Sequence, residues 1–550
     1  MSKTPNRWIG LVFISMAISL VIIDGTIVNT IFPAIIKELF LSSSQVQWVQ
    51  ESYVLVFASL LLVWGSIADR IGRRRLLIIG IAIFTFASIW AGFATSDVSL
   101  IIARIEQGIG GAMVLPTTLS LVNANFTGKD RGIAFAVWGS TIGGMVAVGP
   151  VIGGWLATDF SWRTAFWINI PLGFIIVIGL LLFVKESKVE DLKPKIDYVG
   201  AAISVVMFAT LVFGLIEGRN YGWWSINETR RFEIFGFKWP TEGISVIPIV
   251  LLISAIAFTA FFFWERKREA DGKSVLLDLS LFKIASFRNG SIAALIISMG
   301  EFGLIFALPL WLQNIEGLNA VSSGVVLLWL AGGAFIASGV GGALGGKLSP
   351  VNAIRIGVLL EFVGVAGIAF FVSTAGGWAT IAPFLAIYGV GVGFATAQLT
   401  GVIMVDIPIE KTGQASGSQS TVRQIGSALG IAVLGTMLFT SGQASIQHRI
   451  ENIPELQNIG SSALPVFAFQ IGTAVVESSG AAIENLDDQL LSLGAPQVAV
   501  DKIIVAADEG FTDGVKGTGW AGAFFLLLGF ASTFALGSQA NKKKKAAKAK

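Results

Sequence analysis

Four charged side chains interrupt the first, second and fourth long apolar segments of the chain: Asp24, Glu51, Arg104 and Glu106. A charged group inside a bilayer costs roughly 2.5–3.5 kcal/mol on insertion scales, so each needs a partner, a water-filled cavity or a function. At about 1.5 Å per helical residue, all four fall at similar heights, roughly 22 Å above the inner membrane face. Because desolvation and like charges oppose ionisation, three carboxylates beside one guanidinium predict a cluster that binds and releases protons. The alternative is a static pair in which Arg104 only neutralises Asp24.

The later apolar segments carry further candidates. Glu301 falls near mid-membrane without an obvious partner in its own segment, and Glu361 lies part-way along a later one. These carboxylates, with Phe302 and Trp311, predict an apolar and aromatic cavity that binds a lipophilic cation. Glu301 could instead bind a second proton or be a neutral packing residue, and the aromatic rings could pack or face lipid. Arg423 is expected at the cytoplasmic end of its segment, where its side chain reaches the interface.

The elements that position these residues are membrane-spanning helices. The chain is 54% hydrophobic and 13% charged, whereas a soluble domain carries roughly 25% charged residues, and its mean hydropathy is +0.76. Apolar runs of about 20 residues, the length of a helix that crosses the hydrocarbon, recur along it. We therefore expect an all-α polytopic membrane protein. The fourteen predicted spans cover residues 9–31, 47–67, 75–94, 99–122, 133–157, 164–184, 198–216, 243–264, 287–312, 323–346, 352–373, 380–404, 419–440 and 516–538.

The chain offers few groups for enzyme chemistry. Cys is absent and His448 is the only His, which excludes disulfides, thiolate zinc sites and Cys–His nucleophiles. The sequence therefore predicts that the protein is not an enzyme and uses neither a metal nor a cofactor.

Basic residues gather in loops that would share one side of the membrane. The clearest is GSIADRIGRRRLL, from Gly65 to Leu77, between the second and third spans. Since short loops rich in Lys and Arg stay in the cytoplasm, these loops place both termini inside. The basic tail, 541–550, is expected near anionic lipid headgroups rather than on nucleic acid.

The segment 441–515 faces outward by the same rule, because it holds ten Asp or Glu residues and only two basic ones. Apolar residues at helical spacing between Ala495 and Ala507 predict short amphipathic helices over the outer surface. A solvated cap is the simpler interpretation of this segment. A role in gathering substrate is the alternative.

The fifth span is depleted of side-chain bulk. Its segment GSTIGGMVAVGPVIGG, from Gly139 to Gly154, combines closely spaced glycines with Pro150. Small residues let helices approach closely, and a proline frees a backbone carbonyl. The pattern predicts a hinge or a tight seam with a neighbouring helix.

Together these segments resemble the major facilitator superfamily, specifically its fourteen-helix drug:proton antiporter branch, over nearly the whole chain. The loop after the second span is similar to the superfamily's cytoplasmic latch, and the segments IIDGTIVNTIFP and SWRTAFWINIPLG are similar to parts of the branch's first and sixth helices. The matching residues are Gly65, Asp69, Arg70, Gly72, Arg73 and Arg74 in the latch, Arg104, Gln107, Gly108 and Gly110 in the fourth helix, and Gly149, Pro150, Gly153 and Gly154 in the antiporter motif of the fifth. Glu51 and Glu106 stand where the branch usually has small or apolar residues.

The resemblance implies a major facilitator fold of 14 transmembrane helices, arranged as six, two and six, with cytoplasmic termini. The expected units are a six-helix bundle over 1–190, an inserted helix pair over 191–286, a second bundle over 287–540 that includes the outer loop, and the tail. The two bundles would rock against each other around a central cavity.

The resemblance also implies proton-coupled export of lipophilic, cationic small molecules across the plasma membrane. The proton would be the coupling ion, Arg104 would take part in its transfer, and the latch would tie the two bundles together. Small-molecule substrate and the lipid bilayer would be the partners of a monomeric protein. Two alternatives remain open: a carrier of one physiological solute, such as an amino acid, sugar or siderophore, and a membrane sensor that transports nothing.

Overall fold

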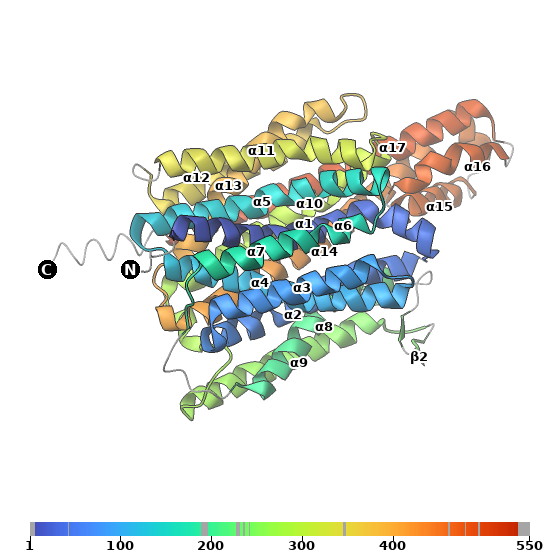
Figure 1. Cartoon of the computed structure of the whole chain (residues 1–550). Coiled ribbons are helices and arrows are strands. Elements are labelled where there is room, and N and C mark those ends of the chain that lie inside the picture. The colour runs from blue at the N-terminus through green and yellow to red at the C-terminus, as the bar shows by residue number, and fades with distance from the viewer. Residues whose placement is uncertain are drawn as a thin grey trace.

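The computed structural model describes residues 6–41, 43–188, 196–226, 232–234, 237–240, 242–344, 348–459, 463–478, 480–492 and 495–536. Within these ranges the chain is almost entirely helical, apart from a short antiparallel hairpin of β1 (Glu233–Ile234) and β2 (Phe237–Lys238). The long helices run side by side as one elongated bundle (Figure 1). The predicted basic tail, 541–550, lies outside the described residues.

Helices lie over all fourteen predicted spans. In the described chain, twelve are long and apolar enough to cross a membrane; α5 and α11 are not among those twelve, so the count of fourteen spans stays a prediction. The helices are α1 (Arg7–Leu39), α2 (Ser43–Ile71), α3 (Arg73–Gly92), α4 (Asp97–Asn125), α5 (Gly128–Asp159), α6 (Thr164–Trp167), α7 (Asn169–Phe183), α8 (Tyr198–Tyr221), α9 (Val246–Ala270), α10 (Ala285–Asn314), α11 (Ala320–Leu344), α12 (Pro350–Phe371), α13 (Ala382–Met404), α14 (Thr412–Glu451), α15 (Ala463–Glu477), α16 (Leu486–Ser492) and α17 (Gln497–Ser532), with 3-10 turns η1 (Leu279–Lys283), η2 (Trp378–Thr380), η3 (Ile409–Lys411), η4 (Pro454–Ile459) and η5 (Ala481–Asn485).

The same packing pattern occurs twice along the chain. In a first helix group, α1–α7, α1 packs on α5, both α2 and α3 pack on α4, and α7 packs against α1 and α3. In a second helix group, α10–α14 with α17, α10 packs on α14, both α11 and α12 pack on α13, and α17 packs against α10 and α12. The second group therefore repeats the helix arrangement of the first.

The two helix groups meet along two sets of helices. Helix α5 packs on α11 and α13, and α14 packs on α2 and α4. Helix α8 packs against α2 and α14 and carries α9 on its other side, so this pair lies along one edge of the junction (Figure 1). The unit boundaries at 190 and 286 stay predictions.

The glycine-rich stretch of α5 forms a seam on two sides. A Cβ atom at Gly149 or Gly153 would lie 1.9 Å or 2.3 Å from a threonine hydroxyl oxygen of α1. A Cβ atom at Gly154 would lie 2.9 Å from a side-chain carbon of Val321 on α11. Pro150 lies inside the helix, between these contacts. Helix α5 can therefore touch both α1 and α11 only because these positions lack side chains.

Two helices extend well beyond the predicted spans. The sequence predicts spans over 419–440 and 516–538. The corresponding helices, α14 and α17, run over Thr412–Glu451 and Gln497–Ser532. Their outer ends, with α15 and α16, form a cap that projects past the bundle at the right of Figure 1. The described residues of the segment 441–515 are mostly helical, and much of this helix continues the two flanking spans instead of forming separate short helices.

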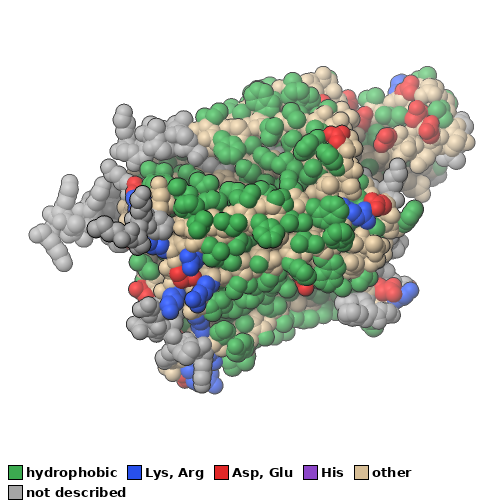
Figure 2. Space-filling model, in the orientation of Figure 1, with side chains coloured by type: hydrophobic (Ala, Val, Ile, Leu, Met, Phe, Trp, Pro, Cys, Tyr) green, Lys and Arg blue, Asp and Glu red, His purple; other side chains and the backbone are tan. Residues whose placement is uncertain are grey.

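The surface is banded along the bundle. Hydrophobic side chains cover its long sides, Lys and Arg gather at the end where α1 begins, and Asp and Glu gather on the projecting cap (Figure 2). A belt of apolar side chains between charged ends is what a bilayer requires of a spanning protein. The charge distribution fits a cytoplasmic side at the basic end and an outer side at the cap.

Candidate functional site

The first helix group contains a buried ion pair between α1 and α4. Arg104 Nη1 donates to Asp24 Oδ2 at 2.5 Å, and both side chains are fully buried. Gln107 and Asn169 donate to Asp24 Oδ1 at 3.1 Å and 2.8 Å. The same two amides donate to the hydroxyl of Ser88 on α3 at 2.8 Å and 3.1 Å. One hydrogen-bond network therefore joins α1, α3, α4 and α7.

Arg104 is also held by α2. Its Nε donates to the Val49 carbonyl at 3.3 Å, and its guanidinium carbon lies 4.2 Å from the centroid of the Tyr53 ring. A cation over an aromatic face is stabilised by the ring quadrupole. These contacts and the Asp24 carboxylate together offset the cost of burying the guanidinium away from water.

Glu51 and Glu106 have different surroundings from this pair. Glu106 follows Arg104 by two residues, which is about 200° around a helix, so it lies on another face of α4. It is half-buried, as is Glu51 on α2. The depth of each residue along its helix is sufficient to pair Asp24 with Arg104. Depth does not predict the face of the helix on which each carboxylate lies. A role in proton coupling for Glu51 and Glu106 stays a prediction.

The second helix group contains a cluster with more acid than base. Glu301 Oε2 on α10 lies 3.6 Å from Arg423 Nη2 on α14. The Thr396 hydroxyl donates to Glu301 Oε1 at 3.4 Å, and the Tyr388 hydroxyl donates to the Glu301 backbone carbonyl at 3.0 Å. Glu301 is thus buried beside a counter-charge that comes from another helix, α14.

Glu361, on α12, is the least compensated member of this cluster. Its side chain is fully buried, and neither carboxylate oxygen has a hydrogen-bond partner among the described residues. It interacts electrostatically with Glu301 and Arg423. Gly391 makes room for it, because a Cβ atom there would lie 2.7 Å from Glu361 Cγ. Burying an ionised carboxylate without donors costs far more than burying the neutral acid, so two carboxyl groups share one guanidinium here.

The two clusters lie partly on corresponding helices of the repeated packing, although Arg104 is on the fourth helix of its group and Arg423 on the fifth. Asp24 and Glu301 lie on the first helix of their groups, and Ser88 and Glu361 lie on the third. The first group therefore has a neutral hydroxyl where the second has a carboxyl group. The sequence predicts more carboxyl groups than basic groups in the cluster of the first helix group. In the structure, this excess lies in the cluster of the second group.

The position of Arg423 differs from the prediction. The sequence places the start of its span at 419, whereas α14 begins at Thr412. Arg423 therefore lies about three turns inside the helix, at the level of Glu301, and not at the interface. Its ion pair with Glu301 makes it a member of the candidate site.

The two predicted aromatic residues lie in different environments. Trp311 is fully buried, and its indole donates to the Thr512 hydroxyl at 3.0 Å, so it packs α10 against α17. These are the contacts of a packing residue, which was the alternative for this side chain. Phe302 is half-buried, and its contact with substrate stays a prediction.

Replacing Trp311 by Phe should lower the stability of the folded protein without changing transport. The variant loses a buried hydrogen bond and leaves a small void, which together cost about 1–3 kcal/mol. Thermal unfolding in detergent measures the first effect, and substrate uptake into proteoliposomes measures the second. A weaker substrate affinity at unchanged stability would instead show that Trp311 lines the substrate cavity.

The predicted latch ties the two helix groups together at the basic end. Asp69 accepts hydrogen bonds from Arg73 Nη2 at 2.7 Å and Nε at 3.1 Å. It also accepts from the backbone amides of Gly413 at 2.9 Å and Gln414 at 3.1 Å, in the first turn of α14. A carboxylate at a helix N-terminus is stabilised by its free amides and by the helix dipole. Arg73 completes the link by donating to the Ile409 carbonyl at 2.7 Å.

The other latch residues shape this contact. A Cβ atom at Gly65 would lie 2.7 Å from backbone atoms of α14, so glycine permits the close approach of α2. Gly72 has a φ of 110°, a left-handed conformation that favours glycine. Arg74 donates to a carbonyl oxygen beyond α7 at 2.9 Å, and Arg70 donates to the Ser274 hydroxyl in the linker after α9. Gly65, Asp69 and Arg73 thus contact the second group directly, Arg70 reaches the linker after α9, and Arg74 contacts the chain beyond α7.

The Asp69→Asn variant should open the cytoplasmic end of the bundle. Each hydrogen bond to a charged group contributes about 1.5–3 kcal/mol, so loss of the charge should shift the equilibrium at least roughly tenfold. Because the natural chain has no Cys, spin labels on Lys188→Cys and Glu410→Cys, both exposed, report the separation of the two groups. A longer distance should become populated.

The matched control for the latch is Asp130→Asn. This change breaks the exposed ion pair between Asp130 and Arg7, and exposed pairs contribute little. Its distance distribution should match that of the parent. An unchanged distribution in Asp69→Asn would mean that the latch does not hold the two groups together.

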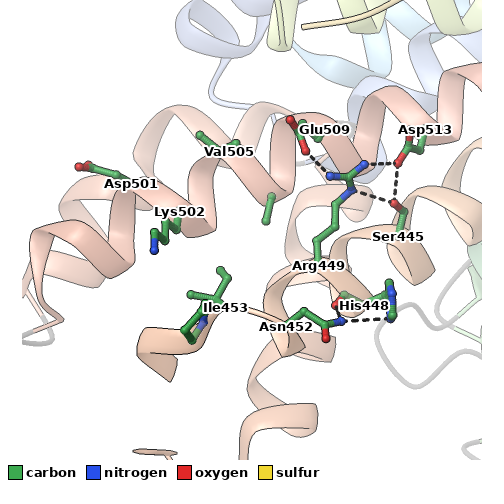
Figure 3. Close-up of a pocket in the computed structure, with 12 residues that line it drawn as sticks. Ser445, His448, Arg449, Asn452, Ile453, Asp501, Lys502, Val505, Glu509 and Asp513 are labelled. Carbon is green, nitrogen blue, oxygen red and sulfur yellow. Dashed lines mark hydrogen bonds and ion pairs between the residues drawn. The ribbon is translucent and has the colours of Figure 1, made fainter. Parts of the chain in front are cut away.

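A cavity of about 820 Å³ lies on the cap, between the outer ends of α14 and α17 (Figure 3). Arg449 enters it and pairs with Glu509 and, at 2.8 Å, with Asp513. Lys502 pairs with Glu455, and this hydrogen bond holds the pKa of the Glu455 carboxyl below its ordinary value. These basic side chains are neutralised within the cap, as expected of a solvated cap. A role in gathering substrate stays a prediction.

Comparison with known proteins identifies the class to which this fold and site belong. The family model of the Major Facilitator Superfamily matches residues 14–226 and 201–431. The chain therefore belongs to the major facilitator superfamily of multi-pass membrane transporters, which are carriers and not enzymes. Both matches end before the cap.

The individual relatives include a named multidrug efflux pump and a named transporter. The chain is 28% identical over 529 residues to the multidrug efflux pump LfrA of Mycolicibacterium smegmatis, covering 96% of this chain and 95% of the relative. It is 30% identical over 447 residues to a probable actinorhodin transporter of Streptomyces coelicolor, covering 79% and 73%. A solved structure of the human organic anion transporter MFSD10 matches with a TM-score of 0.55 and 11% identity, over 95% of this chain and all of that one. At that identity the likeness concerns the fold alone.

Proposed function

We propose that this chain is a proton-driven exporter of lipophilic, cationic small molecules in the plasma membrane, acting as a monomer without a cofactor. The similarity to a named multidrug efflux pump and to a probable actinorhodin transporter supports export of drug-like molecules. The observation that carries the proton coupling is the surplus acid in the second helix group. Glu301 pairs with Arg423, and Glu361, which interacts electrostatically with both, lacks a hydrogen-bond donor among the described residues.

Such a pair of carboxyl groups is suited to exchanging a proton for a cation. With one proton bound, the cluster of two carboxyl groups and one guanidinium is neutral. Loss of that proton to the cytoplasm leaves one net negative charge, which a cationic substrate can compensate. A proton taken up from the outside then displaces the cation. Exchange of one proton for one monovalent cation moves no net charge, so the pH gradient drives it. Each pH unit supplies about 1.4 kcal/mol, and the two-state bundle converts this into transport.

The first helix group supplies a second acid–base pair. Asp24 is bound by Arg104, Gln107 and Asn169, so it can take up a proton only when these donors withdraw. We therefore propose that Asp24 takes part in proton coupling only when the helices rearrange, and that Arg104 supplies the counter-charge. The latch between Asp69 and α14 closes the cytoplasmic end while the outer side is accessible.

Proteoliposomes with an imposed pH gradient test the function. In vesicles whose lumen is acidic, the exporter should accumulate a fluorescent lipophilic cation in the lumen from the outer solution, provided that the cytoplasmic face of the protein is outward. A protonophore should abolish the accumulation. Matched control vesicles with equal pH on both sides should accumulate none of the fluorescent cation.

The same preparation separates the alternatives. Gradient-driven movement of one amino acid, sugar or siderophore, with no movement of the dye, would support a carrier of a physiological solute. No flux of any compound, with a correctly folded protein, would support a sensor. The relatives' names favour export over both alternatives.

A further inference from the structure

A second cavity, of about 380 Å³, lies where α2, α8, α9, η1 and α14 meet. Its lining is almost entirely apolar and rich in phenylalanine, including Phe208 on α8, Phe261 and Phe262 on α9, and Phe282 on η1. Both helix groups contribute to the lining of this cavity, because α2 belongs to the first helix group and α14 to the second. The cavity is separate from both buried acid clusters.

The cavity lies at the depth of the inner leaflet and borders the lipid. Helix α9 runs from the outer side to the basic end, and Phe262 is 16 residues along it, or about 24 Å. Phe258 and Phe262 line the cavity, yet 61% and 39% of their surfaces are exposed on the side of the bundle. An apolar cavity with an exposed apolar wall at this depth is accessible to hydrocarbon chains.

Basic side chains lie at the cytoplasmic edge of this cavity. Arg266 follows Phe262 by four residues, so it lies on the same face of α9, one turn closer to the cytoplasm. Lys283 directly follows Phe282 in η1. Both Arg266 and Lys283 are exposed. Basic groups between helices at the cytoplasmic surface attract anionic lipid headgroups.

We propose that the cavity binds an acyl chain of an anionic phospholipid from the inner leaflet, with its headgroup at Arg266 and Lys283. The phenylalanine lining takes the hydrocarbon chain, and the two basic groups select the charge of the headgroup. Charge complementarity at the rim distinguishes this occupant from a lipophilic cation, which the same two groups would repel. The site does not depend on the proposed transport function.

The bound lipid also stabilises the contact between the two helix groups. Leu62 on α2 and Ser418 on α14 both line the cavity, next to the place where Gly65 meets α14. The linker that leads into η1 accepts hydrogen bonds from Arg70 of the first group and Gln414 of the second. A chain held against these elements favours the arrangement in which the cytoplasmic ends are together.

Native mass spectrometry of the delipidated full-length protein tests the proposal. Phosphatidylglycerol and phosphatidylethanolamine with identical acyl chains should bind with different affinities. A basic residue near an anionic lipid contributes a factor of about five, so both together should favour phosphatidylglycerol roughly 25-fold. The double change Arg266→Gln and Lys283→Gln should remove this preference.

The matched control is Lys185→Gln with Lys188→Gln, which removes two exposed charges from another cytoplasmic loop and should keep the preference. A phosphatidylglycerol with a photoreactive group in one acyl chain should label residues 258–262 and 418–425. Equal binding of the two lipids by the parent, or labelling spread evenly over the apolar belt, would overturn the proposal. Displacement of the photoreactive lipid by a lipophilic cation would also overturn it, since the cavity would then be a substrate site.

Discussion

Replacing Arg104 by Gln should destabilise the folded protein by about 3–5 kcal/mol, because removal of one partner leaves a buried charge without compensation. Asp24 is fully buried on α1, and Arg104 is its only cationic partner among the described residues. Two neutral amides remain, but they cannot neutralise the carboxylate. The measurement is chemical or thermal unfolding in detergent, with transport expected to be lost as well.

Two further variants make this prediction sharper. The double variant Asp24→Asn with Arg104→Gln removes both charges and should recover most of the lost stability, since no buried ion remains. The matched control is Arg163→Gln, which breaks the more exposed pair with Glu38 and should cost at most about 1 kcal/mol. An Arg104→Gln variant as stable as the parent would show that Asp24 is already protonated in the folded state.

Replacing Glu361 by Gln should reduce proton-driven uptake to the level of empty liposomes while the protein stays folded. The side chain keeps its size, but it can no longer exchange a proton. Because both carboxylate oxygens lack donors in the described structure, no hydrogen bond is lost, and stability should change by no more than about 1 kcal/mol. Counterflow of labelled substrate without a pH gradient should be lost as well, because the cluster no longer offers the negative charge that the cation compensates.

The control for Glu361 is Asp406→Asn, an exposed acid at the cytoplasmic end of α13. This variant removes the same charge and should transport like the parent. If Glu361→Gln retains full gradient-driven uptake, proton coupling resides elsewhere, and Glu301 and Asp24 become the next candidates for substitution.

The sequence predicts the helices and the latch well, for identifiable reasons. Few structures other than a helix satisfy the backbone hydrogen bonds of an apolar run inside a membrane. Helices therefore cover the predicted spans. The latch is predicted because Asp69 and Arg73 belong to a specific motif. Its partner could not be derived from the loop alone, since the first turn of α14 lies more than 340 residues away in the chain.

The buried clusters are predicted only in part. Depth along a helix pairs Asp24 with Arg104 and groups Glu106 with them, although the two-residue spacing from Arg104, about 200° around the helix, already places Glu106 on another face. Asn169 and Ser88 are missed as members because neutral polar residues are common in spans and do not stand out. The sequence feature that could have identified Asn169 is its position inside the segment that resembles the branch's sixth helix.

Arg423 is missed for a different reason. Apolar content places the start of its span at 419, because the first turns of α14 are rich in Gly, Ser and Gln. Those turns are buried at the junction with α2 and need no apolar surface for lipid. A helix that begins earlier moves Arg423 into the membrane, where Glu301 is its partner.

Proton release on substrate binding tests the central claim most directly. Purified protein in weakly buffered detergent solution, with a pH-sensitive dye, should release about one proton per molecule when a lipophilic cation is added, because cation and proton compensate the same surplus carboxylate. The Glu361→Gln variant should release none, whereas Asp406→Asn should behave as the parent. Saturating substrate binding without any proton release by the parent would contradict the account.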